Sequence, residues 1–192
     1  MRRPSGYAVR MELLPLPFSP ALSAYCAPAP AGEPVSELIA ELARRGPLSV
    51  LDGGNCFPAY RVLRAVRART ADPTAVMRCI TVRRAFTCFQ MLAMLAAAPG
   101  LPEPCLLLDL LATFYDEQVS APEARRLLEG CLKQVERLAR AAPLLITLTP
   151  PRTAVRVFLT EQVLARVQAV FDPDLPPPAP AQLALFPAPP GG

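Results

Sequence analysis

The chain has 192 residues, of which 52% are hydrophobic, and its formal net charge is +4. This length is enough to bury one sizeable hydrophobic core, so a single folded domain is expected. The small net charge excludes a polycation, and no apolar run approaches the ~20 residues of a membrane span.

Prolines divide the chain into three parts. The 25 prolines crowd into roughly the first 35 and the last 20 residues and leave a proline-poorer body between them. We expect an irregular segment over 1–20, a folded domain over 21–171 and a disordered Pro/Ala-rich tail over 172–192.

Cysteine usage and the N-terminal residues bear on metal binding and compartment. The six cysteines form no C-x-x-C pair, and histidine is absent, which argues against a zinc site. The basic start is followed by an apolar run that prolines interrupt, unlike a signal peptide. These features predict buried, reduced thiols, no metal and a cytoplasmic location.

In chain order, the first half alternates strands and helices. An apolar segment at 21–26 predicts a strand, and a proline-dense loop follows it. A helix over 35–45 comes next, then a buried strand over 48–51. We expect a further helix over 58–69, a short helical turn capped by Asp72, and a strand over 78–82.

The second half continues the alternation. Residues 86–97 read as an apolar helix buried on most sides, and 105–111 as a central strand. A helix over 121–140 carries two expected i,i+4 ion pairs, Glu129 with Lys133 and Glu136 with Arg140. A strand over 144–148, an edge strand over 154–159 and a helix over 160–171 complete the domain. The pattern predicts a doubly wound, mostly parallel α/β sheet.

Several short motifs follow one another at informative spacings. They are Leu51-Asp52-Gly53-Gly54-Asn55-Cys56-Phe57, Asp72-Pro73 with Val76-Met77 and Ile80, Arg84-Ala85-Phe86 with Gln90, and Leu106-Leu107-Leu108-Asp109. Together they resemble the core of RecA/RadA-type recombinase ATPases over about residues 20–150. The resemblance implies a RecA-like, P-loop NTPase-type three-layer fold. In it, Asp109 ends a Walker B-like strand, and 144–148 corresponds to the strand before the second DNA-binding loop.

The nucleotide site of that family is degenerate in this sequence. A P-loop reads G-x-x-x-x-G-K-[ST], because backbone N–H groups cradle phosphates, Lys neutralises them and a hydroxyl holds Mg²⁺. The corresponding segment is Ala27-Pro28-Ala29-Pro30-Ala31-Gly32-Glu33-Pro34. The prolines remove N–H donors there, and Glu33 places a negative charge where the motif needs a cation.

The catalytic Glu of the family aligns with Gly54, which has no side chain to polarise water. Asp109 remains, as a metal ligand with no phosphate to bridge or as a structural acid at a strand end. We therefore expect no enzyme activity and no cofactor. The site remnants are Gly32, Asp52, Gly54 and Asp109.

Arginines cluster in the first half of the domain. A cluster of this kind can track the phosphates of DNA, or it can be a solvated face. The loop over 115–122 is acidic, which does not favour DNA contact there. The candidate DNA-binding residues are Arg61, Arg64, Arg67, Arg83 and Arg84, with Arg69 and Arg78 nearby.

Two terminal peptides resemble docking motifs. Gln182-Leu183-Ala184-Leu185-Phe186 is similar to the Q-L-x-L-F peptide with which bacterial replication and repair proteins bind the sliding clamp. The alternative is that Leu183, Leu185 and Phe186 pack back onto the domain. Phe18-Ser19-Pro20-Ala21 resembles the F-x-x-A peptide that joins neighbouring recombinase subunits.

These observations favour a non-catalytic RecA-like accessory protein of DNA repair or replication that binds the sliding clamp. Its resemblance is to recombinase-like partner proteins of bacterial mutasomes, which implies a RecA-like paralogue or a Y-family polymerase as further partners. One alternative is a nucleotide enzyme that holds Mg²⁺ with Asp52, Asp109, Asp116 and Glu117. Another is a structural subunit paired with an intact recombinase paralogue.

Overall fold

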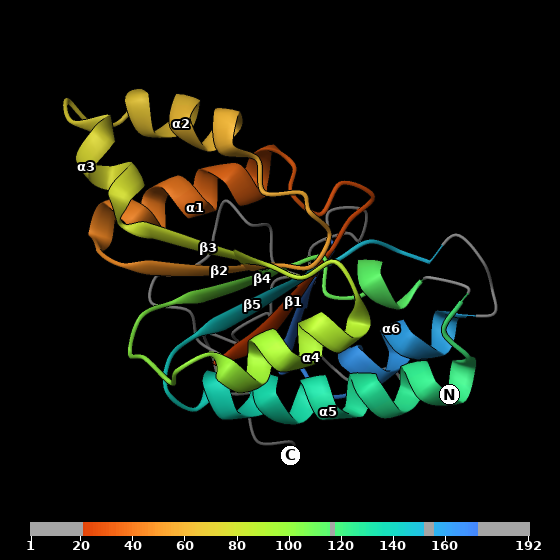
Figure 1. Ribbon diagram of the computed structural model, residues 1–192. Coiled ribbons are helices and arrows are strands. Elements are labelled where there is room, and N and C mark those ends of the chain that lie inside the picture. The colour runs from red at the N-terminus through yellow and green to blue at the C-terminus, as the bar shows by residue number, and fades with distance from the viewer. Residues whose placement is uncertain (1–20, 116–117, 152–155, 173–192) are drawn as a thin grey trace, which may run out of the picture.

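The computed structural model describes residues 21–115, 118–151 and 156–172. Strands and helices alternate, and the helices lie on both faces of one sheet (Figure 1). The strands are β1 (Leu22–Cys26), β2 (Leu48–Asp52), β3 (Ile80–Arg84), β4 (Cys105–Leu108), β5 (Leu144–Leu148) and β6 (Ala169–Phe171). The helices are α1 (Glu33–Arg45), α2 (Ala59–Arg67), α3 (Pro73–Arg78), α4 (Cys88–Ala97), the 3-10 turn η2 (Ala112–Phe114), α5 (Ala121–Ala139) and α6 (Val157–Leu164).

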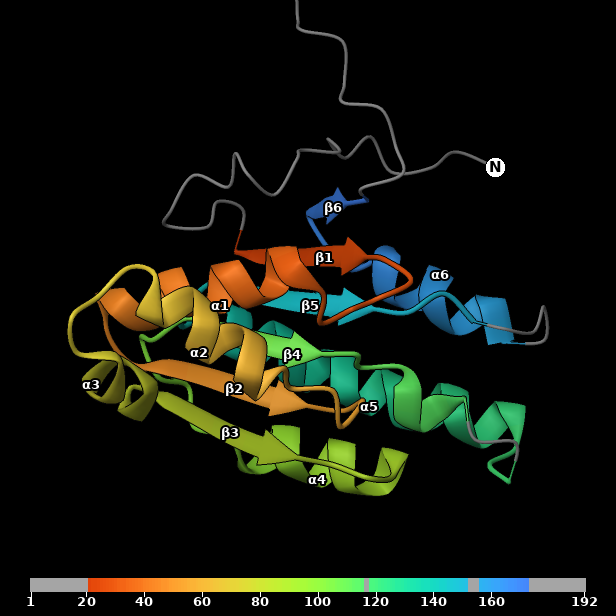
Figure 2. The ribbon, with the colours of Figure 1, turned by 90° about the horizontal axis from the view of Figure 1, so that it is seen from above.

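The six strands are all parallel and lie in the order β3-β2-β4-β5-β1-β6. Helices α1, α2 and α3 cover one face, and α4, α5 and α6 cover the other (Figure 1). Because all strands run in one direction, their carboxyl ends meet at a single edge of the sheet (Figure 2). The expected three-layer α/β fold is confirmed.

Each face of the sheet carries its own hydrophobic core. Leu51 and Leu107 pack with α4 and α5, whereas Val50, Leu106 and Leu108 pack with α1 and α2. Strands buried on both faces need apolar residues at every position, because neither face meets water. This burial explains the nearly continuous apolar runs of β4 and β5.

Two strand boundaries differ from the sequence expectation. Strand β3 begins at Ile80 instead of 78, because α3 continues to Arg78 from its Asp72 cap. The predicted strand over 105–111 ends at Leu108, where Asp109 adopts a left-handed backbone with φ +46°. Left-handed geometry cannot continue a strand, so the next two leucines turn into η2 while remaining buried.

The expectation that α4 is buried on most sides is wrong. Its buried residues are Cys88, Met91 and Leu95, while Phe89 is 54% exposed and Phe86, just before the helix, is 65% exposed. The helix packs beside α5 under the edge strand β3 (Figure 2), so nothing covers its outer side within the described residues.

The C-terminal elements also differ from the sequence expectation. Residues 157–159 begin helix α6 instead of ending an edge strand, and the predicted helix over 160–171 stops at Leu164. Residues 169–171 form β6 because they pair with β1, and no local sequence pattern predicts this pairing. The first two residues of the predicted edge strand, 154 and 155, lie outside the described residues.

The expected ion pairs of α5 form with a different partner. Glu129 and Glu136 both bind Arg166, which follows α6, at 2.9 and 2.7 Å. Arg166 thereby joins the segment after α6 to α5. The i,i+4 spacing within α5 could not predict this long-range pair.

Candidate nucleotide-site remnant at the carboxyl edge of the sheet

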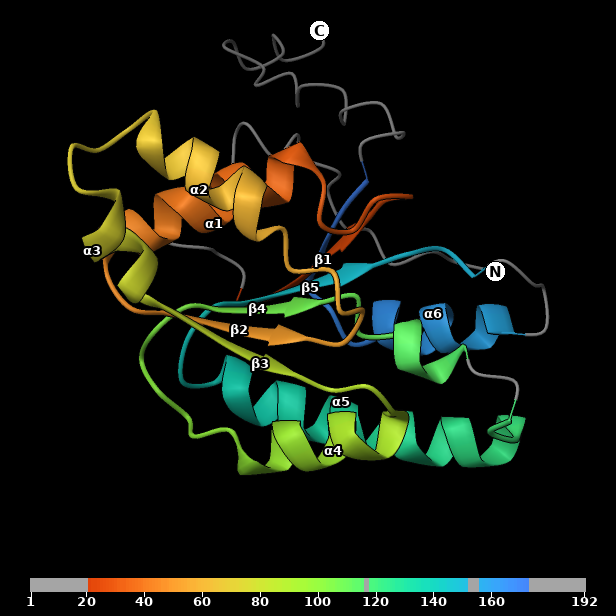
Figure 3. The same ribbon diagram turned by 45° about the horizontal axis from the view of Figure 1, so that its top comes forward.

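Three of the four predicted site remnants come together at the carboxyl edge of the sheet. Asp52 ends β2, and Asp109 directly follows β4, the strand hydrogen-bonded to it. A Cβ built on Gly54 would lie 2.7 Å from the Cβ of Asp109. Gly32 follows β1, a strand that β5 separates from β4 (Figure 3).

Asp52 is fully buried and organises the loop that follows β2. Its carboxylate accepts hydrogen bonds from the N–H groups of Cys56, at 2.9 Å, and Phe57, at 3.0 Å. Arg84, at the end of the neighbouring strand, donates to the same carboxylate at 3.3 Å. A buried charge needs such partners, and this carboxylate finds them in the N–H groups of its own loop and in Arg84.

Asp109 joins the ends of β4 and β5. Its backbone N–H donates to the hydroxyl of Thr147, and its carboxylate accepts from both the N–H and the hydroxyl of Thr149, each at 3.0 Å. Burial raises the pKa of Asp109, the Thr149 hydrogen bonds oppose that shift, and the nearby negative charge of Asp52 adds to it. Both carboxylate oxygens are engaged with protein groups.

The two glycines after Asp52 fit against the Asp109 turn without space for a side chain. A Cβ on Gly53 would come within 2.3 Å of the Met91 methyl and 3.0 Å of the Asp109 carbonyl oxygen. A Cβ on Gly54 would also meet the carboxylate of Asp109 at 3.0 Å. The position of Gly54 is therefore closed to any larger residue while this packing holds.

Neighbouring side chains close the same edge. The Cys56 sulfur lies where it would contact a side chain added at Gly54, at 3.2 Å, and burial raises the pKa of this thiol to about 12. Tyr115 is partly buried, and its hydroxyl donates to the carbonyl of Thr149 at 2.9 Å. A neutral thiol and a phenol thus border the carboxylates.

The acidic magnesium site considered from the sequence finds limited support. Asp52 and Asp109 lie close together as expected, but their oxygens already accept hydrogen bonds. Asp116 and Glu117 lie outside the described residues. Among the described side chains, no three His, Cys, Asp or Glu residues are grouped so that they could hold a metal ion.

The segment between β1 and α1, which the sequence resemblance compares with a P-loop, forms a tight turn into α1. The N–H of Gly32 donates to the carbonyl of Ala29 at 3.1 Å, and Ser36 donates to the Gly32 carbonyl through both its N–H and its hydroxyl. Glu33 occupies the first turn of α1 and pairs with Arg64 at 2.6 Å. The helix N-terminus, which favours an anion, is thus supplied with the protein's own carboxylate.

The predicted basic cluster does not form one surface. Arg64 pairs with Glu33, Arg69 with Glu37, and Arg84 with Asp52. Arg83 lies on the α4 and α5 face of the sheet, opposite the α2 arginines. Arg61, at 3.5 Å from the Ala31 carbonyl, and Arg67 are exposed on the α2 side.

Sequence reasoning missed the partners of these arginines, although a signal for them exists. Glu33, Glu37 and Glu41 repeat at four-residue spacing and form an acidic row on α1. Such a row can bind arginines of a neighbouring helix, and α1 packs on α2.

Gln90, which belongs to the recombinase-like motif set, has a local structural role. Thr87 caps α4 by accepting from the Gln90 N–H at 3.1 Å, and the Gln90 side chain accepts from the Phe86 N–H at 2.8 Å. This reciprocal arrangement is close to a capping box, which starts a helix without any ligand.

The residues of the predicted docking peptides are nearly all outside the described part of the chain. Gln182, Leu183, Leu185 and Phe186 lie outside the described residues, as do Phe18, Ser19 and Pro20. Within the described part of the chain, no helix combines the length and the apolar character needed to cross a bilayer.

No family model matches the chain, and no curated protein is significantly similar to it.

Proposed function

We propose that this protein is a non-catalytic, RecA/RadA-like accessory factor of DNA repair or replication that docks on the bacterial sliding clamp through Gln182-Leu183-Ala184-Leu185-Phe186. The observation that carries the non-catalytic part is the packing of Gly54 on Asp109. The residue that would polarise water is missing, and the space for it is filled.

The surrounding groups support the same conclusion. Phosphoryl transfer depends on positioned phosphates, a bound Mg²⁺ and an oriented water. Here the acids that would serve Mg²⁺ accept hydrogen bonds from backbone and hydroxyl donors, and the Glu33–Arg64 ion pair lies at the start of α1, where a phosphate would have to bind. The domain keeps the parallel-sheet scaffold with an edge that serves its own packing.

The clamp-binding part rests on the terminal peptide. Three large apolar residues, Leu183, Leu185 and Phe186, recur in an otherwise Pro/Ala-rich stretch. A Gln can supply amide hydrogen bonds to a partner while Leu and Phe fill an apolar pocket. Short peptides of this kind bind with dissociation constants of about a micromolar, because ordering the peptide offsets part of the contact energy.

The test is direct binding of the full chain to a purified bacterial sliding clamp, measured by surface plasmon resonance. Replacing both anchors, Leu185→Ala with Phe186→Ala, should weaken binding at least about tenfold. The matched control replaces Leu13 and Leu14, an apolar pair in the other proline-rich terminus, with alanine and should leave binding unchanged. Equal affinity of both variants would sink the clamp assignment.

The alternatives predict different outcomes. A nucleotide enzyme that uses Asp52 and Asp109 would turn over ATP and lose that turnover in Asp109→Ala. A structural subunit would co-elute with an intact recombinase paralogue or a Y-family polymerase whether or not the terminal peptide is intact. The clamp-dependent pattern distinguishes our proposal from both.

A further inference from the structure

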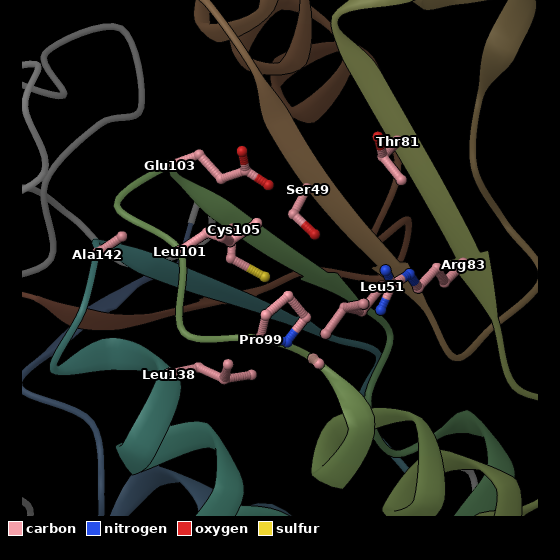
Figure 4. A pocket seen from close by; sticks show the side chains of 11 residues that line it. Ser49, Leu51, Thr81, Arg83, Pro99, Leu101, Glu103, Cys105, Leu138 and Ala142 are labelled. Carbon is pink, nitrogen blue, oxygen red and sulfur yellow. The ribbon is translucent and has the colours of Figure 1, made fainter.

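A small pocket lies near the amino ends of the strands, away from the closed carboxyl edge. Its volume is about 120 Å³, and it opens between the starts of β2, β3 and β4 and the segment that follows α4 (Figure 4). Its lining combines side chains of β2, β3 and β4 with those of α5 and of the segments that follow α4 and α5: Ser49, Leu51, Thr81, Arg83, Ala98, Pro99, Leu101, Glu103, Cys105, Leu138 and Ala142.

The pocket exists because of two local features. Helix α4 ends at Ala97, and the chain then turns through Pro99 and Leu101 toward β4, so no side chain of α4 covers this part of the sheet. The strand positions beneath it carry the small residues Ser49 and Thr81, where a large apolar residue would fill the space. The sheet face therefore stays accessible at this end.

Opposite charges stand on opposite sides of the pocket. Arg83 reaches in from β3, and Glu103 lies on the far side, with Ser49 and Cys105 between them (Figure 4). Neither charged side chain forms an ion pair with another of the described residues. Leu51 and Leu138 are buried and provide an apolar floor.

We propose that this pocket binds a small zwitterion, an α-amino acid with a short apolar side chain. Its carboxylate would lie on Arg83, whose planar guanidinium suits bidentate binding of carboxylates. Its ammonium group would lie on Glu103, and its side chain would pack on Leu51 and Leu138. This assignment is independent of the clamp-binding function.

The size of the pocket limits the ligand. Sites for drug-sized molecules are about 300–1,000 Å³, well above the volume found here. An enclosed apolar cavity of about 150 Å³ accommodates benzene. This pocket is smaller but open on one side, so only part of a ligand has to lie inside it. The apolar side chain of an amino acid such as valine is small enough for the pocket while its charged groups lie at the open side, whereas a nucleotide is too large.

The experiment is a titration of the ¹⁵N-labelled full chain with three probes, followed by ¹H–¹⁵N correlation spectra. The probes are L-valine, isovalerate, which lacks the ammonium group, and isobutylamine, which lacks the carboxylate. Valine should give saturable shifts of Ser49, Arg83 and Cys105 and of the loop over 98–104. Each of the other probes should bind roughly tenfold more weakly or worse, because it loses one charge-assisted contact.

Two variants locate the site. Arg83→Met should weaken valine binding roughly tenfold or more, while Arg78→Met, which removes an exposed arginine of α3, should leave it unchanged. The absence of saturable shifts with valine would overturn the proposal. So would valine binding that survives Arg83→Met, and equal binding of isovalerate would overturn the zwitterion assignment.

Discussion

Replacing Gly54 with alanine tests the close packing that defines the carboxyl edge. The added Cβ would lie 2.7 Å from the Cβ of Asp109, 3.0 Å from its carboxylate oxygen and 3.2 Å from the Cys56 sulfur. The first of these contacts is shorter than real Cβ atoms show, and Asp109 is itself held by Thr149. The loop or the end of β4 must therefore shift.

The expected cost follows from overpacking. Inserting one methyl group into a well-packed site typically costs about 1–3 kcal/mol. For a domain of this length, each kcal/mol lowers the melting temperature by about 2–4 °C, so a decrease of roughly 2–12 °C is expected. The free energy of unfolding should be measured by urea denaturation followed by circular dichroism.

Gly100→Ala is the matched control for this prediction. A Cβ at Gly100 would meet its nearest neighbour, the Ala141 methyl, at an ordinary 3.6 Å. This variant should stay within about 0.5 kcal/mol of the wild type. Equal stability of the Gly54 and Gly100 variants would refute the close packing on Asp109.

A double-mutant cycle identifies Asp109 as the residue that Gly54 contacts. Asp109→Gly removes the Cβ that the methyl group introduced by Gly54→Ala would strike, and glycine suits the φ of +46° at position 109. Gly54→Ala should therefore cost less in that background, with a coupling of about 1 kcal/mol. Additive costs would place the clash elsewhere.

Two further predictions concern Asp109 and the start of α4. Because burial raises the pKa of Asp109, its ionisation destabilises the fold. The wild type should lose stability as pH rises from the usual carboxyl pKa through this raised value. The Asp109→Asn variant has no ionisable group at this position, so it should not lose stability in this way. Its free energy of unfolding relative to the wild type should therefore increase between about pH 4 and 7 in paired urea titrations. A relative decrease would show that the carboxylate charge stabilises the fold. Thr87→Ala removes the cap on the Gln90 N–H and should lower the free energy of unfolding by about 1 kcal/mol in the same assay, whereas an unchanged midpoint would contradict the cap.

The sequence predicts the sheet well where burial dominates. Strands such as Leu144–Leu148 are buried on both faces, so their apolar runs carry enough information to locate them. Caps such as Asp72 are equally local, because the acceptor and the N–H of Ala75 lie three residues apart. These features depend on neighbours in the chain.

The remaining features depend on partners that are distant in the chain. β6 forms because Ala169–Phe171 pairs with β1, and Arg166 reaches back to α5. The motifs point to Asp109 and Gly54 as site positions, but their mutual contact arises only when β2 and β4 pair. Long-range contacts of this kind are absent from any local pattern.

We expect this protein to bind no nucleotide at the carboxyl edge of the sheet. The most direct measurement is a calorimetric titration of the full chain with ATP and Mg²⁺ up to about 1 mM, which would detect even weak binding. We expect no saturable heat. Saturable binding that Asp109→Ala abolishes would contradict the closed edge and the non-catalytic role that rests on it.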